Sequence, residues 1–157
     1  MNPVHLHLML NHAPLFGSVV SLVLLFFALW RQSDELKKIA LALIVLTALI
    51  TLPVYLTGEP AEDIVEPFPG VVRSAIDSHE DAAKIAFVCM LGTGAMALFG
   101  LWIFRGRRFV AGWFTTSLLI VLLVTGLFMA RAANLGGKVR HPEIGTTSQA
   151  EAQHEKD

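Results

Sequence analysis

The chain has 157 residues, a length that suits a single domain. Its hydrophobic content of 54% and its mean hydropathy of +0.60 are high, because soluble domains have roughly 45–50% apolar residues. The formal net charge is −1 and no basic stripe is present, which argues against nucleic acid as a partner. The single cysteine, Cys89, excludes an internal disulfide framework. These features predict a polytopic membrane protein whose main partner is the lipid bilayer.

Four apolar runs approach the roughly 20 residues that a helix needs to cross a bilayer. They cover residues 13–30, 39–56, 82–104 and 110–130. Such continuous runs must be helical, because in lipid the backbone is satisfied only within helices or closed barrels. No basic residue precedes the first run, so we expect it to remain as a helix and not to be removed as a signal peptide. The sequence therefore predicts an all-α integral membrane four-helix bundle over residues 1–145, followed by a disordered polar tail over 146–157.

The connection between the second and third runs, residues 57–81, is the longest and is rich in acidic residues. We expect a short helical turn at 61–66 and, after it, a short interfacial segment with an apolar face. The residues of that face are Val71, Val72 and Ile76. Ser78 and the acidic residues after it are typical of a helix start, and Gly136-Gly137 is typical of a helix stop. The sequence shows no convincing internal repeat.

Basic residues gather in the two short turns, at 31–38 and 105–108, whereas the long middle connection holds only Arg73. The positive-inside rule places the two short turns in the cytoplasm. Trp30, Trp102 and Trp113 lie at the same ends of their spans, as one half of an aromatic belt would. We therefore expect a multi-pass protein of the bacterial inner membrane with both termini in the periplasm.

Five of the six histidines map to the interfacial layer on the periplasmic side of this topology. They are His5, His7, His12, His79 and His141. On one continuous helix His7 and His12 diverge by roughly 140°, so they bind the same small ion only if the segment before Leu10 is not helical. No span has an ionisable residue at its centre, so we expect any chemistry at the outer rim.

A b-type haem can be held by two imidazoles from facing helices at similar depth. His12 and His79 open the first and third spans and are the preferred axial ligands, with His7 and His141 as a second pair. Small residues on these spans either make room for the macrocycle or let the helices pack closely. They are Gly17, Gly92, Gly94, Ala95, Ala97 and Gly100. The hypothesis describes a non-catalytic cytochrome-like subunit with haem b as cofactor, which passes electrons to a redox partner at the periplasmic face.

A divalent-metal site is the first alternative, because imidazole and carboxylate ligands suit zinc, iron or manganese. Its ligands would come from His12, His79, Glu62, Glu66 and Glu80. A second alternative is a purely structural subunit in which the histidines only bond to lipid headgroups or to the backbone. No Ser-His-Asp spacing, phosphate-binding glycine loop or paired carboxylate motif stands out, so an enzyme is not indicated.

The order of motifs resembles a family of small four-span bacterial membrane proteins, domain of unknown function 2231. The segment from His7 to Pro14 is similar to the His-x4-His-x-Pro entry of that family. The resemblance continues in a Thr-Gly turn after the second span, in a histidine that opens the third and in a Gly-Gly pair followed by a histidine after the fourth. These are Thr57-Gly58, His79, Gly136-Gly137 and His141. The chain departs at Ala13, where the family usually has Phe, and in the polar segment 138–142. The resemblance implies four helices and singles out His7, His12 and His79, but it implies no activity.

Overall fold

The computed structural model describes residues 3–67, 71, 73–106 and 109–140. In this part of the chain every regular element is an α-helix. The helices are α1 (Pro3–Leu10), α2 (Ala13–Trp30), α3 (Asp34–Leu56), α4 (Gly58–Val65), α5 (Arg73–Phe104) and α6 (Gly112–Arg140). Four segments are long and apolar enough to cross a membrane: Val4–Trp30, Asp34–Val65, Arg73–Phe104 and Gly112–Val139. The prediction of an all-α, multi-pass membrane bundle is confirmed. The expected tail at 146–157 lies outside the described residues.

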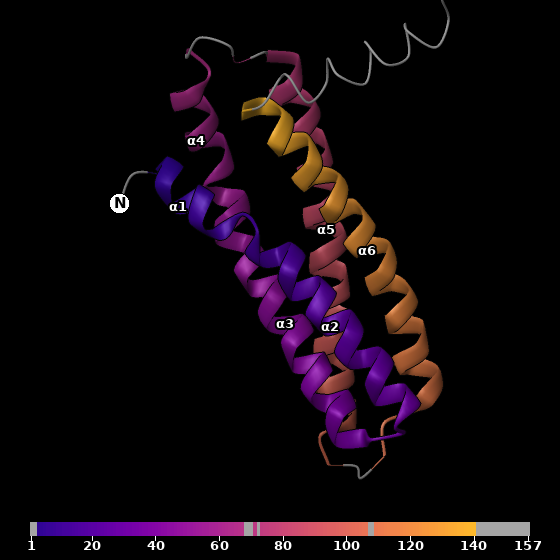
Figure 1. Cartoon of the computed structure of the whole chain (residues 1–157). Coiled ribbons are helices and arrows are strands. Elements are labelled where there is room, and N and C mark those ends of the chain that lie inside the picture. The colour runs from indigo at the N-terminus through magenta and orange to yellow at the C-terminus, as the bar shows by residue number, and fades with distance from the viewer. Residues whose placement is uncertain (1–2, 68–70, 72, 107–108, 141–157) are drawn as a thin grey trace, which may run out of the picture.

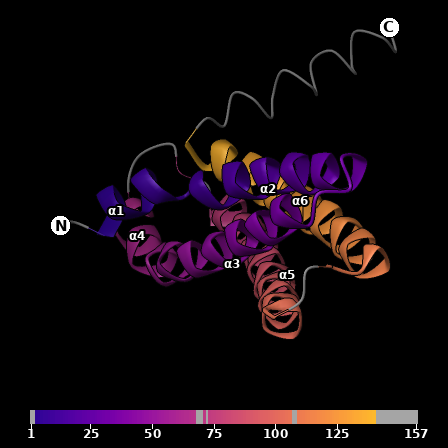
Figure 2. The ribbon, with the colours of Figure 1, turned by 90° about the horizontal axis from the view of Figure 1, so that it is seen from below.

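The four long helices form a closed ring in which α2 packs on α3, α3 on α5, α5 on α6, and α6 on α2 (Figure 1, Figure 2). One end of the bundle carries α1, α4, the start of α5 and the end of α6, and we name it the histidine end. The other end carries the two short turns after α2 and α5, and we name it the basic end. The N-terminal helix, the acidic connection and the end of α6 therefore share one side of the bundle.

Local sequence explains where two of the helices begin. Pro14 lies in the first turn of α2, where its missing N–H has no intrahelical partner to lose. Ser33 caps α3, since its hydroxyl oxygen accepts a hydrogen bond from the Leu36 N–H at 3.3 Å. Gln32 completes the turn between α2 and α3 with a φ of 51°, a left-handed conformation that is uncommon outside glycine.

Several helices extend beyond the apolar runs that revealed them. The expected helix start at Ser78 is wrong, because Ser78 lies inside α5 and donates its hydroxyl to the Ser74 carbonyl at 2.7 Å. Ile76, expected in a separate interfacial segment, is buried within the same helix, and Val72 is outside the described residues. The expected stop at Gly136-Gly137 is also wrong, because α6 continues to Arg140. The helical turn expected at 61–66 is confirmed as α4.

The basic end is closed by one buried cation. Lys37 donates from Nζ to Asp34 Oδ1 at 2.9 Å and to the Val110 carbonyl at 3.1 Å. The same Asp34 oxygen accepts the Val110 N–H at 3.1 Å. This network joins the start of α3 to the chain that enters α6, and it satisfies polar groups that would otherwise be costly at the edge of a membrane.

Apolar side chains face both inward and outward, as expected for a bundle in lipid. Leu25, Leu41, Met90 and Leu122 are fully buried between the helices. Large apolar side chains are also widely exposed along the outer surface of all four spans, where a soluble protein would be polar. The exposed apolar surface indicates contact with the lipid bilayer.

Candidate functional site

His7 is held by α1 against the end of α3. Its Nδ1 lies 3.1 Å from the Val54 carbonyl oxygen and 3.4 Å from Thr57 Oγ1. Val54 is among the last four residues of α3, whose carbonyls have no N–H partner within the helix. A carbonyl can only accept, so Nδ1 carries the proton and Nε2 keeps a lone pair. The half-buried ring also lies near Gly58, because a Cβ at Gly58 would be 3.7 Å from its Cε1 atom.

His79 makes the same kind of contact from α5 to α6. Its Nδ1 lies 2.9 Å from the Ala132 carbonyl oxygen, so this ring also donates from Nδ1 and keeps a lone pair on Nε2. The ring lies directly against Gly136, where an added Cβ would be 2.9 Å from Cε1 and 3.1 Å from Nδ1. The His79 imidazole therefore occupies the space that a side chain at residue 136 would need. This accounts for a glycine at this position inside α6.

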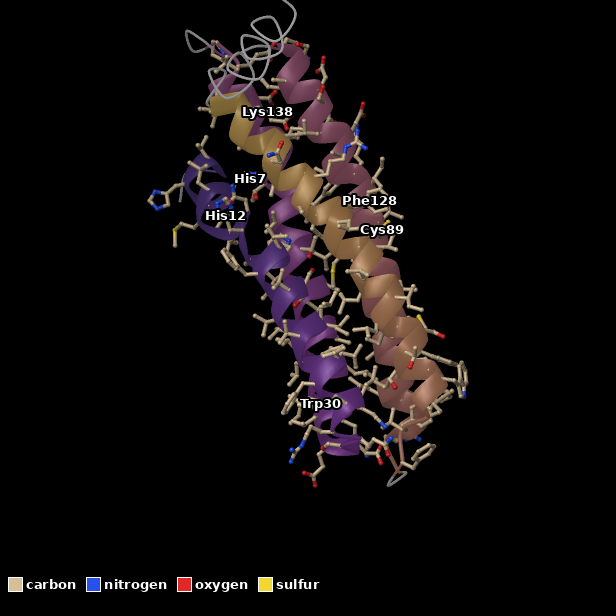
Figure 3. The ribbon with its side chains drawn as sticks, turned by 45° about the vertical axis from the view of Figure 1, so that its right-hand side comes forward. His7, His12, Trp30, Cys89, Phe128 and Lys138 are labelled. Atoms are coloured by element: carbon tan, nitrogen blue, oxygen red, sulfur yellow. The ribbon has the colours of Figure 1, made fainter. Side chains whose placement is uncertain are left out.

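His7 and His79 lie at the same end of the bundle, the histidine end. The two histidines belong to different spans, and His79 is within electrostatic range of His7. Both rings are only partly exposed. Figure 3 shows His7 and His12 at this end and Trp30 at the opposite end. The sequence predicted that histidines from separate spans share one end of the bundle, and the structure places His7 and His79 at the same end.

His12, the preferred partner of His79 in the sequence analysis, is placed differently. It is exposed at the N-cap position of α2, after a break in the helix at residues 11 and 12, and its side chain makes no capping hydrogen bond. His5 is exposed on α1. The described geometry therefore favours His7 over His12 as the partner of His79. His141 lies outside the described residues, so its pairing with His7 stays a prediction.

A ring nitrogen that donates to a backbone carbonyl is a common feature of metal-binding histidines. The hydrogen bond fixes the tautomer and the orientation of the ring, so that the other nitrogen points its lone pair at the metal. His7 and His79 both have this arrangement, each with a main-chain acceptor on a neighbouring helix. The pair is thus two preset Nε2 donors at one end of a membrane bundle.

Small residues on α2 and α5 were expected to leave room for a macrocycle. This expectation is wrong at the three glycines that contact a neighbouring helix. A Cβ at Gly17 would collide with Thr47, one at Gly94 with Ala48, and one at Gly100 with Phe114. Neighbouring helices therefore already fill these places, and the alternative of close helix packing is confirmed. Gly92 has open space around it and is exposed.

Two of the three glutamates in the divalent-metal hypothesis form ion pairs with basic side chains. Glu80 pairs with Lys84 at 2.7 Å, and Glu66 pairs with Arg73. Glu62 on α4 is half-buried and interacts electrostatically with Glu80 across the gap to α5. Among the described residues no three His, Cys, Asp or Glu side chains are placed to hold one ion. The geometry therefore gives more weight to the imidazole pair than to a mixed carboxylate site.

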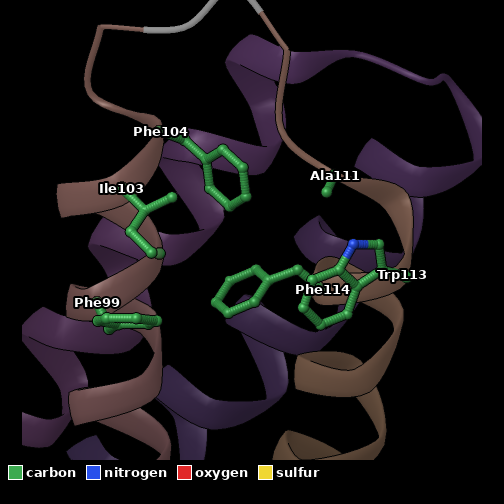
Figure 4. Close-up of a pocket in the computed structure, with 7 residues that line it drawn as sticks. Phe99, Ile103, Phe104, Ala111, Trp113 and Phe114 are labelled. Carbon is green, nitrogen blue, oxygen red and sulfur yellow. The ribbon is translucent and has the colours of Figure 1, made fainter.

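A pocket of about 240 Å³ lies at the basic end, between α5 and α6 (Figure 4). It is lined by apolar side chains that include Phe99, Phe104, Trp113 and Phe114. The pocket lies at the opposite end of α5 from His79, and none of its lining residues is titratable. It is therefore separate from the candidate site.

Comparisons of the chain with known protein families, with curated proteins and with solved structures find no match. The candidate site is consequently defined by its own geometry. The sequence did not reveal the two main-chain acceptors of the site, the carbonyls of Val54 and Ala132. It indicated only turns or helix ends at Gly58 and Gly136. The available signal was a histidine near the start of one helix with a glycine near the end of the next.

Proposed function

We propose that the protein is a b-type cytochrome-like membrane subunit that transfers electrons at one face of the membrane, with His7 and His79 as the axial ligands of haem b. One observation carries this proposal. Two imidazoles from different spans lie at one end of the bundle, within electrostatic range of each other, and each donates from Nδ1 to a backbone carbonyl, which leaves both Nε2 atoms to bind a metal.

The number of donors favours haem over a protein-only metal site. Zinc in proteins takes three or four protein ligands. A haem iron has four ligands from its own macrocycle and needs only two axial ones, which a pair of histidines supplies. The chemistry of the donor set at the histidine end thus fits haem. Because the small residues of α2 and α5 are already packed, the macrocycle belongs at that end and not in the middle of the bundle.

When bound, haem supplies reversible one-electron chemistry. The residues of this chain would hold and orient it. The Val54 and Ala132 carbonyls fix the two ring orientations and make the imidazoles more basic ligands. Partial burial of both rings limits the access of water, and the electron would pass to a redox partner that docks at the histidine end.

The proposed location is the bacterial inner membrane, with the histidine end and both termini in the periplasm. Arg31, Lys38 and Arg105 all belong to the basic end, as the positive-inside rule requires of a cytoplasmic face. Arg107 and Arg108, which also entered this prediction, lie outside the described residues. We also propose membership of the family of domain of unknown function 2231, supported by the His-x4-His-x-Pro entry, which has no bearing on activity.

The test is the absorption spectrum of the full chain, purified in detergent and incubated with haemin, together with metal analysis. We expect one bound haem and a reduced spectrum with sharp α and β bands. His7→Ala and His79→Ala should each remove one axial ligand and change the spectrum. His5→Ala is the matched control, because His5 is exposed on the same helix as His7 and should leave the spectrum unchanged.

The following results would count against this proposal. A protein that does not bind haem is not a cytochrome. Stoichiometric zinc or iron without a haem spectrum would favour the divalent-metal site, and the absence of both would favour a purely structural subunit. If His12→Ala removes the ligand and His7→Ala does not, the proposed pairing of His7 with His79 is wrong and the pairing of His12 with His79 expected from the sequence is supported.

A further inference from the structure

Two segments of the chain place a histidine and an aromatic motif at the same spacing. Phe27-Ala28-Leu29-Trp30 at the end of α2 matches Phe99-Gly100-Leu101-Trp102 near the end of α5. The separation from His7 to the first Phe equals the separation from His79 to the second, and the same holds for the two Trp residues. The phenylalanine and tryptophan rings are in contact in both copies, with centroids 5.7 Å and 6.3 Å apart. The offset in residue number that carries His7 onto His79 therefore also superimposes the two motifs.

The same offset superimposes the buried faces of α2 and α5. The five buried positions of α2 are Pro14, Ser18, Ser21, Leu25 and Ala28. Their counterparts on α5 are Ala86, Met90, Thr93, Ala97 and Gly100, and all five are buried. The histidine, the aromatic motif and the buried face are thus all related by the same offset in residue number, although the sequences of α2 and α5 share few identical residues.

The second helices of the two hairpins, α3 and α6, also correspond in sequence position. Their offset in residue number is slightly larger and is the one that carries Val54 onto Ala132. These two residues provide the carbonyl acceptors, and each is followed one helical turn later by a glycine near the ring that it binds, Gly58 or Gly136. The buried residues Ala40, Ile44, Thr47 and Thr51 have buried counterparts at this offset. These are Leu118, Leu122, Thr125 and Met129. The offset grows between the first helix and the second because the turn of the second hairpin is longer.

Helix packing has the symmetry that two such copies require. If α2 corresponds to α5 and α3 to α6, a two-fold axis along the bundle makes the α2–α3 contact equivalent to the α5–α6 contact. It also makes the α3–α5 contact equivalent to the α6–α2 contact. All four contacts are present, and Figure 2 shows the arrangement turned by 90° from Figure 1. Both hairpins start at the histidine end, so they form a parallel repeat, a type whose ligands bind between the copies in other membrane proteins.

We propose that the chain is a duplicated helical hairpin, residues 7–58 and 79–136, in which His7 and His79 are equivalent donors that bind opposite faces of one planar metal macrocycle on the axis between the hairpins. The identity of the ligand rests on the proposed function, whereas the duplication does not. Each hairpin supplies one imidazole, one carbonyl that sets its tautomer and one glycine near its ring. The site consequently has a single centre, with one ligand from each copy.

The first measurement needs no ligand. The full chain with 15N-labelled histidine is studied by NMR in detergent micelles, and the resonances are assigned with single His→Ala variants. We expect His7 and His79 to share one tautomer, protonated on Nδ1 and unprotonated on Nε2, whereas the exposed His5 and His12 exchange between tautomers. Different tautomers at His7 and His79 would overturn the equivalence of the two copies, whether or not haem binds.

The second measurement uses haemin as the probe. His7→Ala and His79→Ala should weaken haemin binding by the same factor, to within about threefold, and should give the same five-coordinate spectrum. Specific binding should be lost in the double variant. A large effect of one substitution and none of the other would overturn the two-faced site. If wild-type protein shows the shared tautomer and binds no haemin, the macrocycle and the proposed function are both refuted while the duplication is supported.

Discussion

Gly136→Ala is the substitution that most sharply separates a site from ordinary packing. The new Cβ would lie 2.9 Å from Cε1 of His79, whereas carbon atoms at optimal contact are about 3.5–4.0 Å apart. The ring must therefore retreat by roughly 0.6 Å or more. The hydrogen bond from Nδ1 to Ala132, now 2.9 Å, would then lengthen by up to the same amount, to about 3.5 Å, which is beyond the usual range.

The stability of the protein should hardly change. Replacing glycine by alanine inside a helix gains about 1 kcal/mol, while the loss of one hydrogen bond costs about 0.5–1.5 kcal/mol. Loss of the partner that orients a metal-binding histidine typically lowers affinity by about 10- to 100-fold. We therefore expect Gly136→Ala to fold normally and to bind haemin about 10- to 100-fold more weakly, as measured by titration at the Soret band.

Gly58→Ala is the matched control, because its Cβ would meet His7 at 3.7 Å, an ordinary contact. This variant should keep its affinity for haemin within about threefold. The reasoning is refuted if Gly136→Ala binds haemin as tightly as the wild type, or if both variants lose affinity equally. NMR of labelled His79 provides a second readout, since loss of the single Nδ1-protonated tautomer is expected in Gly136→Ala alone.

Two further predictions concern the membrane core and are measured as changes in unfolding free energy in detergent. Gly94→Ala should destabilise the bundle by about 1–3 kcal/mol, because its Cβ collides with Ala48, while Gly92→Ala, with open space around it, should be neutral or stabilising. Equal effects of these two substitutions would contradict the packing. Ser21→Ala should stabilise by about 1 kcal/mol, because Ser21 Oγ is buried and has no hydrogen-bond partner among the residues that the structure describes. Ser18→Ala should destabilise, since that hydroxyl donates to the Pro14 carbonyl at 2.7 Å, and a larger loss from Ser21→Ala would refute this assignment.

The fold was predictable because the dominant constraint is simple. Long apolar runs in lipid can only be helices, and the first run, 13–30, matches α2 at both ends. The ends of the other helices were predicted less well, since α5 begins at Arg73, well before the apolar run that starts at Ala82. Hydropathy locates the part of a helix that lies in lipid, whereas the polar extension from Arg73 is stabilised by packing and by local ion pairs such as Arg73–Asp77.

The candidate site was predictable in its location and not in its partners. Loop charges and span order placed the histidines on one side, and that required no tertiary detail. The choice of His7 over His12 depends on the interruption of the helix at residues 11–12, which leaves His12 exposed and which no motif marks. The acceptors at Val54 and Ala132 are main-chain groups, so their residue types carry no signal.

The proposed internal repeat is difficult to recognise in the sequence. Its two halves need different offsets, one that relates His7 to His79 and a larger one that relates Val54 to Ala132, because the second turn is longer. Few residues are identical, and the strongest local match is Phe27-Ala28-Leu29-Trp30 against Phe99-Gly100-Leu101-Trp102. Packing maintains the pattern of burial and not the identity of each residue, so the repeat is clearer in the helix contacts than in the letters.

Electron paramagnetic resonance of the ferric, haemin-loaded full chain tests most directly whether His7 and His79 bind one iron from both sides. We expect a low-spin signal of a six-coordinate haem with two imidazole ligands in the wild type and in His5→Ala. In His7→Ala and in His79→Ala the same preparation should give a high-spin signal. A wild-type spectrum that is high-spin, or a low-spin spectrum that survives either substitution, would contradict the proposed site.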